Sequence, residues 1–515
     1  MTATAEAKAE AAPARTYPSV VHMLAEAATL AAEQTALVCG DSTLDYREYA
    51  RCVGGFANKL IGLGARGERI ALVIGNSMEM AIATFAVHAA GAQVVPINPM
   101  YTAREMRPIL ADADPIAVVH DSAAAELVTE IAAELAIADR IAVGPGGEDL
   151  LGWRSDDRAA LPDPLPAAGD PATLQYTGGT TGRSKGVNLS HGAIATNITQ
   201  RETLTPSQID KERMLCVMPL FHIYASHCCL QTMAYARGTL VIEKRYHPGE
   251  TLRALARHKI TIFAGSPTIF SGLMAFEDFA QADLSSLRFS YSGSAPLPEE
   301  VLNRWEAATG TPIVEGYGQS EAGPVLTYNP LHGTRKAGSV GVALPQTELQ
   351  IVDTETGAKV LGTGEVGEIR ARGPQIMRGY RNLPAETDEA LRDGWLYTGD
   401  IGEFDGDGYL FIRDRKKDMV ICGGYNVYPR EIDEVLYGHH DVLEAAAIGV
   451  PDDYRGEVIK AFVALKPGAG ANAEDLLAYC RANLARYKLP AEIALCDELP
   501  KTSVGKIDKK ALKPA

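Results

Sequence analysis

Hydrophobic and polar positions in the first third of the chain alternate between short β-rich runs and longer helical stretches. The apolar run Arg69–Ile74 is followed by a Gly-Asn-Ser turn, in which Asn76 or Ser77 can cap a helix that extends to Gly91. Strands joined by helices through short links predict a parallel α/β sheet. Three further runs continue this pattern: Gln93–Ile97, Ile116–His120 and Ile141–Val143.

The same order of elements returns near the middle of the chain. Phe289–Tyr291 is a predicted strand that leads into a Ser-Gly-Ser turn, and a helix then opens at Pro298. A further predicted strand, Ile313–Glu315, follows this helix. Because open α/β sheets bind their ligands at strand ends, we expect the turns after these two strands to face a ligand.

After Gly338 the pattern changes to short strands separated by glycines, which predicts an antiparallel or barrel-like subdomain. The charged stretch Arg413–Asp418 follows and predicts a domain boundary, beyond which a new α/β pattern begins. The expected strands of the subdomain are Leu349–Val352, Gly367–Arg370 and Gly408–Ile412. The last hundred residues predict helices at Pro429–Tyr437 and Glu474–Leu484, and strands at Ala446–Val450 and Lys460–Leu465.

These patterns predict an α/β fold with a large N-terminal domain and a small C-terminal domain. The large domain is expected to hold doubly wound α/β subdomains plus a small β-barrel-like subdomain, and the small domain to be a mobile α+β unit. The expected boundaries are a disordered tail over residues 1–15, the N-terminal domain over 16–413, a hinge over 414–417 and the C-terminal lid domain over 418–515.

Length and composition exclude several classes of protein. A chain of 515 residues with 46% hydrophobic and 22% charged residues is globular and is too long for a small binding module. Its net charge of −16 argues against nucleic-acid binding through a basic surface. The eight cysteines form no C-x-x-C pair, the N-terminus is unlike a secretory signal, and no apolar run is long enough for a membrane span. We therefore expect a cytoplasmic protein with reduced thiols and without integral membrane contact.

The segment Tyr176–Gly186 concentrates the residues that a polyphosphate needs. It contains four glycines, three threonines, a serine and two cations in eleven positions. Glycines let backbone N–H groups approach phosphate oxygens, hydroxyls donate hydrogen bonds and cations offset charge. Lys185 is followed by Gly186, so the segment is not a Walker A loop. A plain flexible surface loop is the alternative explanation for such a composition.

This segment resembles the phosphate loop of the adenylate-forming superfamily, which includes acyl-CoA synthetases, 4-coumarate-CoA ligases and beetle luciferases. Four later motifs follow in the family's order and extend the resemblance over essentially the whole chain. Glu315–Glu321 is similar to the G-Y-G-x-T-E motif, Tyr397–Asp400 to T-G-D, Asp414–Asp418 to the hinge, and Lys501–Lys506 to the C-terminal P-K-T-x-x-G-K signature. Ser320 stands where the family usually has Thr, and it keeps the hydroxyl.

The resemblance implies ATP, Mg²⁺ and coenzyme A as cosubstrates and cofactors of a two-step ligase reaction. It gives the catalytic role to Lys506, His222, Glu321 and Lys185, and the metal role to Glu321 and Thr177. It places the CoA site at Gly423, Gly424 and Tyr425, and the hinge at Lys417. The nucleotide-binding residues that it implies are Thr177, Gly178, Gly179, Thr180, Thr181, Gly182, Ser294, Ala295, Pro296, Glu315, Gly316, Tyr317, Gly318, Ser320, Asp400, Ile412 and Arg415.

Each of these assignments has a simpler alternative in the residues themselves. Tyr317 offers a flat face for adenine but could be an ordinary core tyrosine, and Glu321 suits Mg²⁺ but could be a solvated surface glutamate. Asp400 could accept both ribose hydroxyls, with Arg415 as a further donor, although a charged run is often merely solvated. Lys506 follows a glycine in what looks like an exposed tail, where its acetylation would remove the charge that adenylation needs.

The expected acyl pocket carries mixed signals about the substrate. The motif Met218–Cys228 and the segment Glu321–Leu326 are similar to plant 4-coumarate-CoA ligases, whereas Lys417–Pro429 resembles bacterial fatty acyl-CoA synthetases. Tyr224 could bond a substrate phenol or close an apolar tunnel. We favour a medium- or long-chain fatty acid over an aryl-propenoic acid. The pocket residues that the resemblance implies are Tyr224, Cys228, Gly265, Ser292, Gly293, Gly318, Pro324 and Val325.

Other functions share the same motifs. A fatty acyl-AMP ligase would load a carrier protein instead of CoA, a luciferase-type oxygenase would emit light, and an inactive sensor would bind nucleotide without turnover. The expected partners are the carboxylic acid, ATP, CoA and a lysine acetyltransferase that acts on Lys506. The chain is expected to be a monomer or a homodimer.

Overall fold

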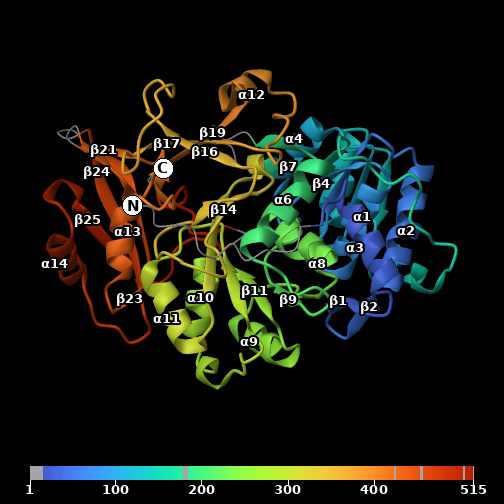
Figure 1. Cartoon of the computed structure of the whole chain (residues 1–515), viewed down its shortest axis with the longest axis horizontal. Helices are drawn as coiled ribbons and strands as arrows, with labels where there is room; N and C mark the ends of the chain where they lie inside the picture. The colour runs from blue at the N-terminus through green and yellow to red at the C-terminus, as the bar shows by residue number, and fades with distance from the viewer. Residues whose placement is uncertain (1–14, 178–183, 423–424, 453–455, 503–504, 514–515) are drawn as a thin grey trace, which may run out of the picture.

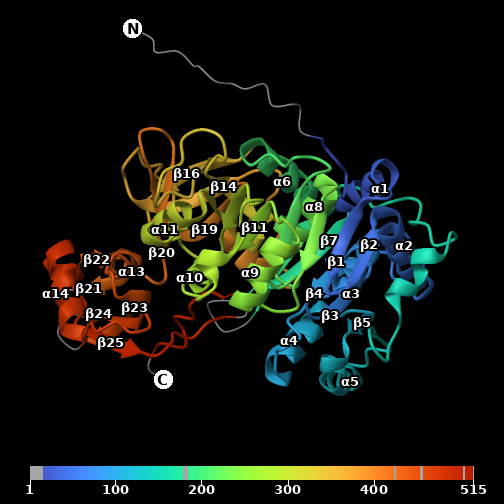
Figure 2. The same cartoon turned by 90° about the horizontal axis from the view of Figure 1, so that it is seen from below.

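The computed structural model describes residues 15–177, 184–422, 425–452, 456–502 and 505–513. Two large sheets with their helices form the first two thirds of the chain, and a smaller antiparallel sheet follows them (Figure 1). A fourth sheet belongs to a C-terminal unit that has a hydrophobic core of its own. Figure 2 shows this unit, coloured orange to red, beside the large domain. The predicted α/β fold class is therefore confirmed.

The first large sheet has six strands in the order β6-β5-β3-β4-β7-β8. All neighbouring strands are parallel except β7 and β8, which form an antiparallel pair. The strands are β3 (Arg69–Val73), β4 (Gln93–Pro96), β5 (Ala117–His120), β6 (Asp139–Ala142), β7 (Pro171–Thr177) and β8 (Lys185–Ser190). The helices are α2 (Tyr46–Gly62), α3 (Met78–Ala89), α4 (Ala103–Ala113) and α5 (Ala125–Glu134).

The second large sheet has nine strands in the order β15-β14-β13-β12-β11-β9-β10-β1-β2. Its central strands from β13 to β1 are parallel, and antiparallel strands flank them on both edges. The strands are β1 (Thr35–Cys39), β2 (Ser42–Asp45), β9 (Arg213–Cys216), β10 (Thr239–Ile242), β11 (Ile262–Gly265), β12 (Phe289–Ser292), β13 (Ile313–Gly318), β14 (Val325–Tyr328) and β15 (Val342–Ala343). The helices are α1 (Val20–Leu30), α6 (His191–Leu204), α7 (Ile223–Ala225), α8 (Thr232–Ala236), α9 (Pro248–Arg257), α10 (Pro267–Met274) and α11 (Glu299–Thr309).

One continuous core joins the two large sheets. Apolar residues of both sheets and of helices α1, α2, α3 and α6 belong to it, and every residue of α3 except Glu79 is buried. Ser77 caps α3, since its Oγ accepts the N–H of Met80 at 3.1 Å. Asn76, the other predicted cap, instead accepts the N–H of Leu220 at 2.7 Å and so ties the end of β3 to the second sheet.

The third sheet is antiparallel and curls into a half-barrel, as the glycine-punctuated strands predicted. Its small core contains Val340, Ile351, Ile369 and Leu410. The elements are β16 (Glu348–Val352), β17 (Gly367–Arg372), α12 (Pro384–Ala390), β18 (Leu391–Arg392), β19 (Trp395–Phe404) and β20 (Leu410–Arg415).

The C-terminal unit has a five-stranded sheet in the order β22-β21-β24-β23, with β25 paired to β24. The predicted helix Pro429–Tyr437 is present with the same bounds as α13, whereas two strands are longer than their apolar runs because their ladder continues to the pair Asp452 and Gly456. The elements are β21 (Val420–Cys422), β22 (Tyr425–Val427), α13 (Pro429–Tyr437), β23 (Val442–Asp452), β24 (Gly456–Leu465), α14 (Ala473–Asn483) and β25 (Glu492–Cys496).

Two expectations from composition can be compared with the fold. All eight cysteines lie in the described part of the chain and are free thiols, as predicted. Among the residues that the structure describes, no helix is long and apolar enough to cross a membrane.

Candidate active site

A cavity of about 240 Å³ lies between the large domain and the C-terminal unit. Its walls come from the turn after β12, from the end of β13, from β19 and β20, and from α13 and the end of the chain. Lys506 lines the cavity together with most of the predicted nucleotide-binding residues. Those residues are Ser294, Ala295, Pro296, Glu315, Gly316, Tyr317, Gly318, Asp400, Ile412 and Arg415.

The carboxyl ends of β12 and β13 form the floor of this cavity. The two strands are parallel, with Ser292 opposite Glu315, so the turns that follow them meet at one edge of the sheet. Ser294 has a φ of 69°, a left-handed conformation that turns the chain sharply after β12. The N–H of Leu297 donates to Oε1 of Glu315 at 2.9 Å, and burial raises the pKa of Glu315 to about 7. The buried carboxylate thereby fixes the turn over the cavity.

Asp400 is held in place from two sides. The hydroxyl of Tyr317 donates to Oδ2 of Asp400 at 2.7 Å, and Nε of Arg415 lies 3.4 Å from Oδ1. Asp400 and Arg415 are directly opposite one another on β19 and β20. The motifs around residues 317, 400 and 415 therefore meet at one carboxylate, as the resemblance implies. The Asp400 side chain is only 8% exposed, so its contacts are mainly with protein atoms and not with solvent.

Lys506 reaches the cavity from the end of the chain. The hydroxyl of Thr268 on α10 donates to the carbonyl oxygen of Gly505, and this bond docks the terminal segment on the large domain. Figure 2 shows the red segment after β25 running back towards α10. The expectation of an exposed tail is wrong here, because Lys506 is only partly accessible. Burial lowers its pKa to about 8, and the Arg415 charge acts in the same direction.

His222 lies close enough to Lys506 for the positive charge of the lysine to affect the pKa of the imidazole. Burial, followed by the positive charge of Lys506, lowers the pKa of His222 to about 4. Nδ1 of His222 accepts the N–H of Tyr224 at 3.3 Å, so this nitrogen carries no proton. The imidazole is therefore neutral at pH 7, with its N–H at Nε2 available as a donor.

The structure describes the predicted phosphate loop only at its two ends. Thr177 ends β7 and Lys185 begins β8, and the two residues are paired across the hairpin. Gly178, Gly179, Thr180, Thr181 and Gly182 lie outside the described residues.

Tyr380 connects this hairpin to Glu321, and sequence reasoning missed it. Its hydroxyl donates to Oε1 of Glu321 at 2.8 Å, and Nζ of Lys185 lies 4.9 Å from the centre of its ring. Tyr380 also forms an isolated β-bridge with Val187 of β8. No motif marks this residue, and its role depends on contacts between distant segments.

The predicted Mg²⁺ position has the oxygen donors that this ion requires. Glu321, in the short helix η5 (Ser320–Ala322), contributes a carboxylate, and Thr177 contributes a hydroxyl. Mg²⁺ is commonly held by one or two protein oxygens and by substrate phosphates, so a site without three clustered protein ligands is compatible with it. Among the described residues, no group of three or more His, Cys, Asp or Glu side chains forms a metal cage. Burial raises the pKa of Glu321, which a bound cation would counteract.

The predicted acyl-pocket residues are mostly buried. The Tyr224 hydroxyl donates to the carbonyl oxygen of Tyr291 at 3.4 Å, and its ring faces Gly293, where a Cβ atom would lie 3.3 Å from Cζ. Gly318 is required by close packing, since a Cβ there would lie 1.9 Å from the carbonyl oxygen of Pro324. The remaining members are Cys228 in the π-helix η3 (Ser226–Gln231), Gly265, Ser292 and Val325.

The predicted CoA loop and hinge are only partly described. Gly423 and Gly424 lie outside the described residues, and for Tyr425 the structure describes the backbone, which begins β22. Lys417 lies two residues after the end of β20, and burial lowers its pKa.

The arrangement corresponds to a known family. A family model for AMP-binding enzymes matches residues 24–381, and a model for the C-terminal domain of AMP-binding enzymes matches residues 431–506. The chain therefore belongs to the AMP-binding enzyme family, and its relatives place it among the AMP-forming acid–CoA ligases.

Individual relatives extend over nearly the whole chain. A long-chain-fatty-acid–CoA ligase of Bacillus subtilis (strain 168) is 38% identical over 482 residues, which cover 87% of this chain and 85% of the relative. A feruloyl-CoA synthase of an Amycolatopsis species is also 38% identical, over 94% of this chain and 96% of its own.

Solved structures agree on the fold. The ATP-bound MatB of Rhodopseudomonas palustris has a TM-score of 0.87 at 32% identity and covers 96% of this chain and 98% of its own. An anthranilate CoA ligase in complex with anthranoyl-AMP has a TM-score of 0.91 at 29% identity, with 97% of each chain covered.

Proposed function

We propose that this protein is an ATP-dependent acyl-CoA synthetase that activates a hydrophobic carboxylic acid through an acyl-adenylate and transfers the acyl group to CoA. The observation that carries the proposal is the convergence of Lys506, Asp400 and Tyr317 on one cavity, although they come from two domains. A site that held nucleotide without reacting would not need a partly buried lysine brought in from the chain end.

The first half-reaction follows from the charges around the cavity. A carboxylate oxygen of the acid attacks the α-phosphorus of ATP, the bond between that phosphorus and the α,β-bridging oxygen breaks, and pyrophosphate leaves with the bonding electrons. With a pKa of about 8, Lys506 is mostly protonated at pH 7 and can stabilise the negative charge that builds on the α-phosphate oxygens. Asp400, which is held by Tyr317 and Arg415, would accept the ribose hydroxyls. Bound Mg²⁺ would supply further charge neutralisation on the phosphates, held by Glu321 and Thr177.

The nucleophile of the second half-reaction is the thiol of CoA. The thiolate sulfur of CoA attacks the acyl carbon, and AMP leaves with the electrons of the acyl–oxygen bond. Neutral His222 contacts Tyr224 of the predicted acyl pocket and can donate a hydrogen bond from Nε2. Gly423, Gly424 and Tyr425 remain our proposed CoA loop, with Lys417 as the hinge.

Two substrate classes are supported by different observations. A medium- or long-chain fatty acid is favoured by the similarity to the long-chain-fatty-acid–CoA ligase of Bacillus subtilis and by the apolar surroundings of Tyr224 and Cys228. An aryl acid is the second candidate, favoured by the equal identity to the feruloyl-CoA synthase and by the phenol group of Tyr224 within the pocket.

Pyrophosphate release measured over a panel of acids tests the proposal. Acetate, fatty acids of increasing length, benzoate and 4-coumarate are each supplied with Mg-ATP, with and without CoA, and acyl-CoA is quantified by mass spectrometry. Lys506→Ala should lower pyrophosphate release roughly 100- to 1000-fold, the usual cost of removing one group that stabilises a developing oxyanion. Lys513→Ala, an exposed lysine in the same terminal segment, is the matched control and should retain full activity.

The outcomes separate the alternatives. Thioester formed from one class of acid supports the synthetase. Adenylate that accumulates without thioester indicates a ligase that loads a carrier protein, and light emission indicates an oxygenase. Tight ATP binding without pyrophosphate release from any acid would contradict the proposal and indicate an inactive sensor.

A further inference from the structure

Arg201 is a buried cation that the proposed mechanism does not use. It lies in the second half of α6 and is 1% exposed. Its Nη1 donates to Oγ1 of Thr232 at 2.9 Å, but within the described residues Nε and Nη2 have no hydrogen-bond partner. Native proteins satisfy most buried polar atoms, and two free donors on one buried guanidinium therefore need an explanation.

Among the described residues, no carboxylate is hydrogen-bonded to this guanidinium, although the charge of the neighbouring Glu202 attracts it. The carboxylate of Glu202 accepts both the N–H and the hydroxyl of Ser207, at 2.8 and 3.0 Å. The carboxylate of Glu212 pairs with Arg288. The guanidinium lies instead between two tyrosine rings, whose centres are 5.2 Å (Tyr291) and 5.7 Å (Tyr328) away. Aromatic faces attract a cation but do not accept the directed hydrogen bonds of its remaining N–H groups.

The same face of α6 holds the predicted acyl pocket. Asn197 lies one turn before Arg201, and its side chain both donates to the carbonyl oxygen of Val325 at 2.8 Å and accepts the N–H of Val325 at 3.1 Å. Residues four apart on a helix share one face, so Arg201 points towards the same wall as Asn197. Tyr291, which touches the guanidinium, also receives the Tyr224 hydroxyl at its carbonyl oxygen. Arg201 therefore borders the set of predicted acyl-pocket residues.

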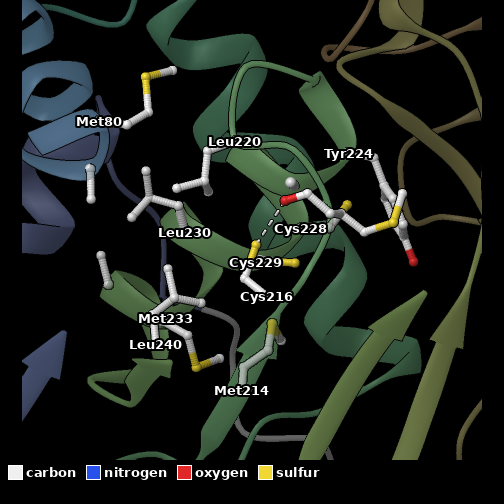
Figure 3. Packing of buried hydrophobic residues seen from close by; sticks show 14 of the residues in the cluster. Met80, Met214, Cys216, Leu220, Tyr224, Cys228, Cys229, Leu230, Met233 and Leu240 are labelled. Carbon is white, nitrogen blue, oxygen red and sulfur yellow. Dashed lines mark hydrogen bonds between the residues drawn. The ribbon is translucent and has the colours of Figure 1, made fainter. Parts of the chain in front are cut away.

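Arg201 lies at the end of this set that is far from the reacting groups. The opposite wall is the helical stretch from α7 through η3 to α8, which starts beside His222 and reaches Thr232 after ten residues. At 1.5 Å per residue this is a distance of about 15 Å. Tyr224 and Cys228 lie along it, among the buried side chains of Figure 3. The middle of this wall is a π-helix, a conformation that is frequent at functional sites.

We propose that Arg201 is the distal anchor of the acyl site and donates hydrogen bonds to an oxygen atom at the far end of the substrate acid. The preferred substrate is then an acid with a hydroxyl, alkoxy, carbonyl or carboxylate oxygen on its tail, and a plain hydrocarbon acid of the same length is a poorer substrate. This inference rests on the proposed function, whose acyl site it makes more specific. A buried donor that a substrate leaves unpaired discriminates strongly, because the loss of solvation is not compensated.

Matched pairs of acids test this anchor. Decanoate is compared with the ω-hydroxy acid and the dicarboxylate of the same length, and cinnamate with 4-coumarate, by kcat/KM for pyrophosphate release. We expect the oxygenated member of at least one pair to be preferred roughly 10- to 100-fold, the range for a hydrogen bond to a charged group. The hydroxy acid, the dicarboxylate and the phenol distinguish which kind of oxygen accepts the hydrogen bonds of the guanidinium.

Two variants test which residue causes the preference for oxygenated acids. Arg201→Met removes the donors and keeps a long side chain, so the ratio of kcat/KM between the two members of a pair should fall to about one. Tyr224→Phe removes the other polar group of the pocket and should leave the preference in place. If Tyr224→Phe abolishes the preference and Arg201→Met does not, the anchor is Tyr224 and the proposal is wrong. Equal kcat/KM for both members of every pair in the wild-type protein also overturns it.

A binding measurement separates this proposal from the proposed function. The shift in thermal unfolding temperature on adding each acid, without ATP, reports binding even if no acid is turned over. The oxygenated acids should raise the unfolding temperature of the wild-type protein more than that of Arg201→Met. Equal shifts for the two proteins contradict the anchor, whereas a complete lack of thioester contradicts the synthetase. The unfolding temperature of Arg201→Met without ligand shows directly whether the variant is folded.

Discussion

Raising the pH should slow adenylate formation over the range in which Lys506 loses its proton. Burial and the neighbouring Arg415 lower the pKa of Lys506 to about 8 in the free enzyme. About nine tenths of the protein then carries the charged amine at pH 7 and about one tenth at pH 9. Because only the charged form stabilises the developing phosphate charge, kcat/KM for adenylation should fall roughly tenfold between these two values. Glu315, with a pKa of about 7, titrates earlier and contributes little to the change above pH 8.

Pyrophosphate exchange without CoA is the suitable assay, because it leaves out the ionisation of the CoA thiol. Lys506→Arg is the matched control, since a guanidinium keeps its charge throughout this range. The rate of Lys506→Arg should be lower than that of the wild-type protein, because a planar guanidinium does not fit the space of a compact ammonium group. Its pH profile should nevertheless be flat from pH 7 to 9. A flat profile for the wild-type protein, or the same fall in both proteins, would refute the assignment of this lysine.

Three further predictions concern the surroundings of the site. Tyr380→Phe removes the hydrogen bond to Glu321 and should lower kcat/KM for Mg-ATP about tenfold without changing the unfolding temperature. Gly318→Ala places a Cβ 1.9 Å from the carbonyl oxygen of Pro324 and should lower the unfolding temperature, whereas Gly62→Ala, with open space around its position, should not. Burial lowers the pKa of three core histidines besides His222, so the unfolded chain binds more protons below pH 6.5. The free energy of unfolding in urea should therefore fall there by roughly 1.4 kcal/mol per pH unit for each histidine; a midpoint that is unchanged between pH 7 and 5 would contradict this. These residues are His88, His191 and His227.

Local patterns explain what could be predicted of the fold. Helix α13 has the predicted bounds because Pro429 starts it and its apolar positions recur at helical spacing. Strands β23 and β24 exceed the predicted runs, since their ends are polar and are held by pairing with one another. Sheet order could not be predicted either, because it depends on contacts such as the bond from Asn76 to Leu220, which are remote in sequence.

The residues of the candidate site also divide into those that the sequence could predict and those that it could not. Asp400, Tyr317 and Arg415 were found because motifs mark them, and the structure joins them. Tyr380 and Arg201 belong to no motif, and each is recognisable only by its three-dimensional partners or by the lack of them. Lys506 was expected in an exposed position, because the sequence around it does not reveal that Thr268 docks the neighbouring carbonyl oxygen.

The cavity depends on contacts that cross the predicted hinge. Arg430 of α13 donates from Nη1 to the carbonyl oxygen of Ile412 at 2.7 Å, and its backbone N–H donates to Asp414 at 3.0 Å. If the chain turns at Lys417, both bonds break together with the Thr268 bond that docks the Lys506 segment. The position of Lys506 and the position of α13 are therefore linked, so that a rotation that brings the Gly423 loop to the site also removes the lysine. One hinge would in this way allow adenylation and thioester formation to use the same acyl pocket in turn.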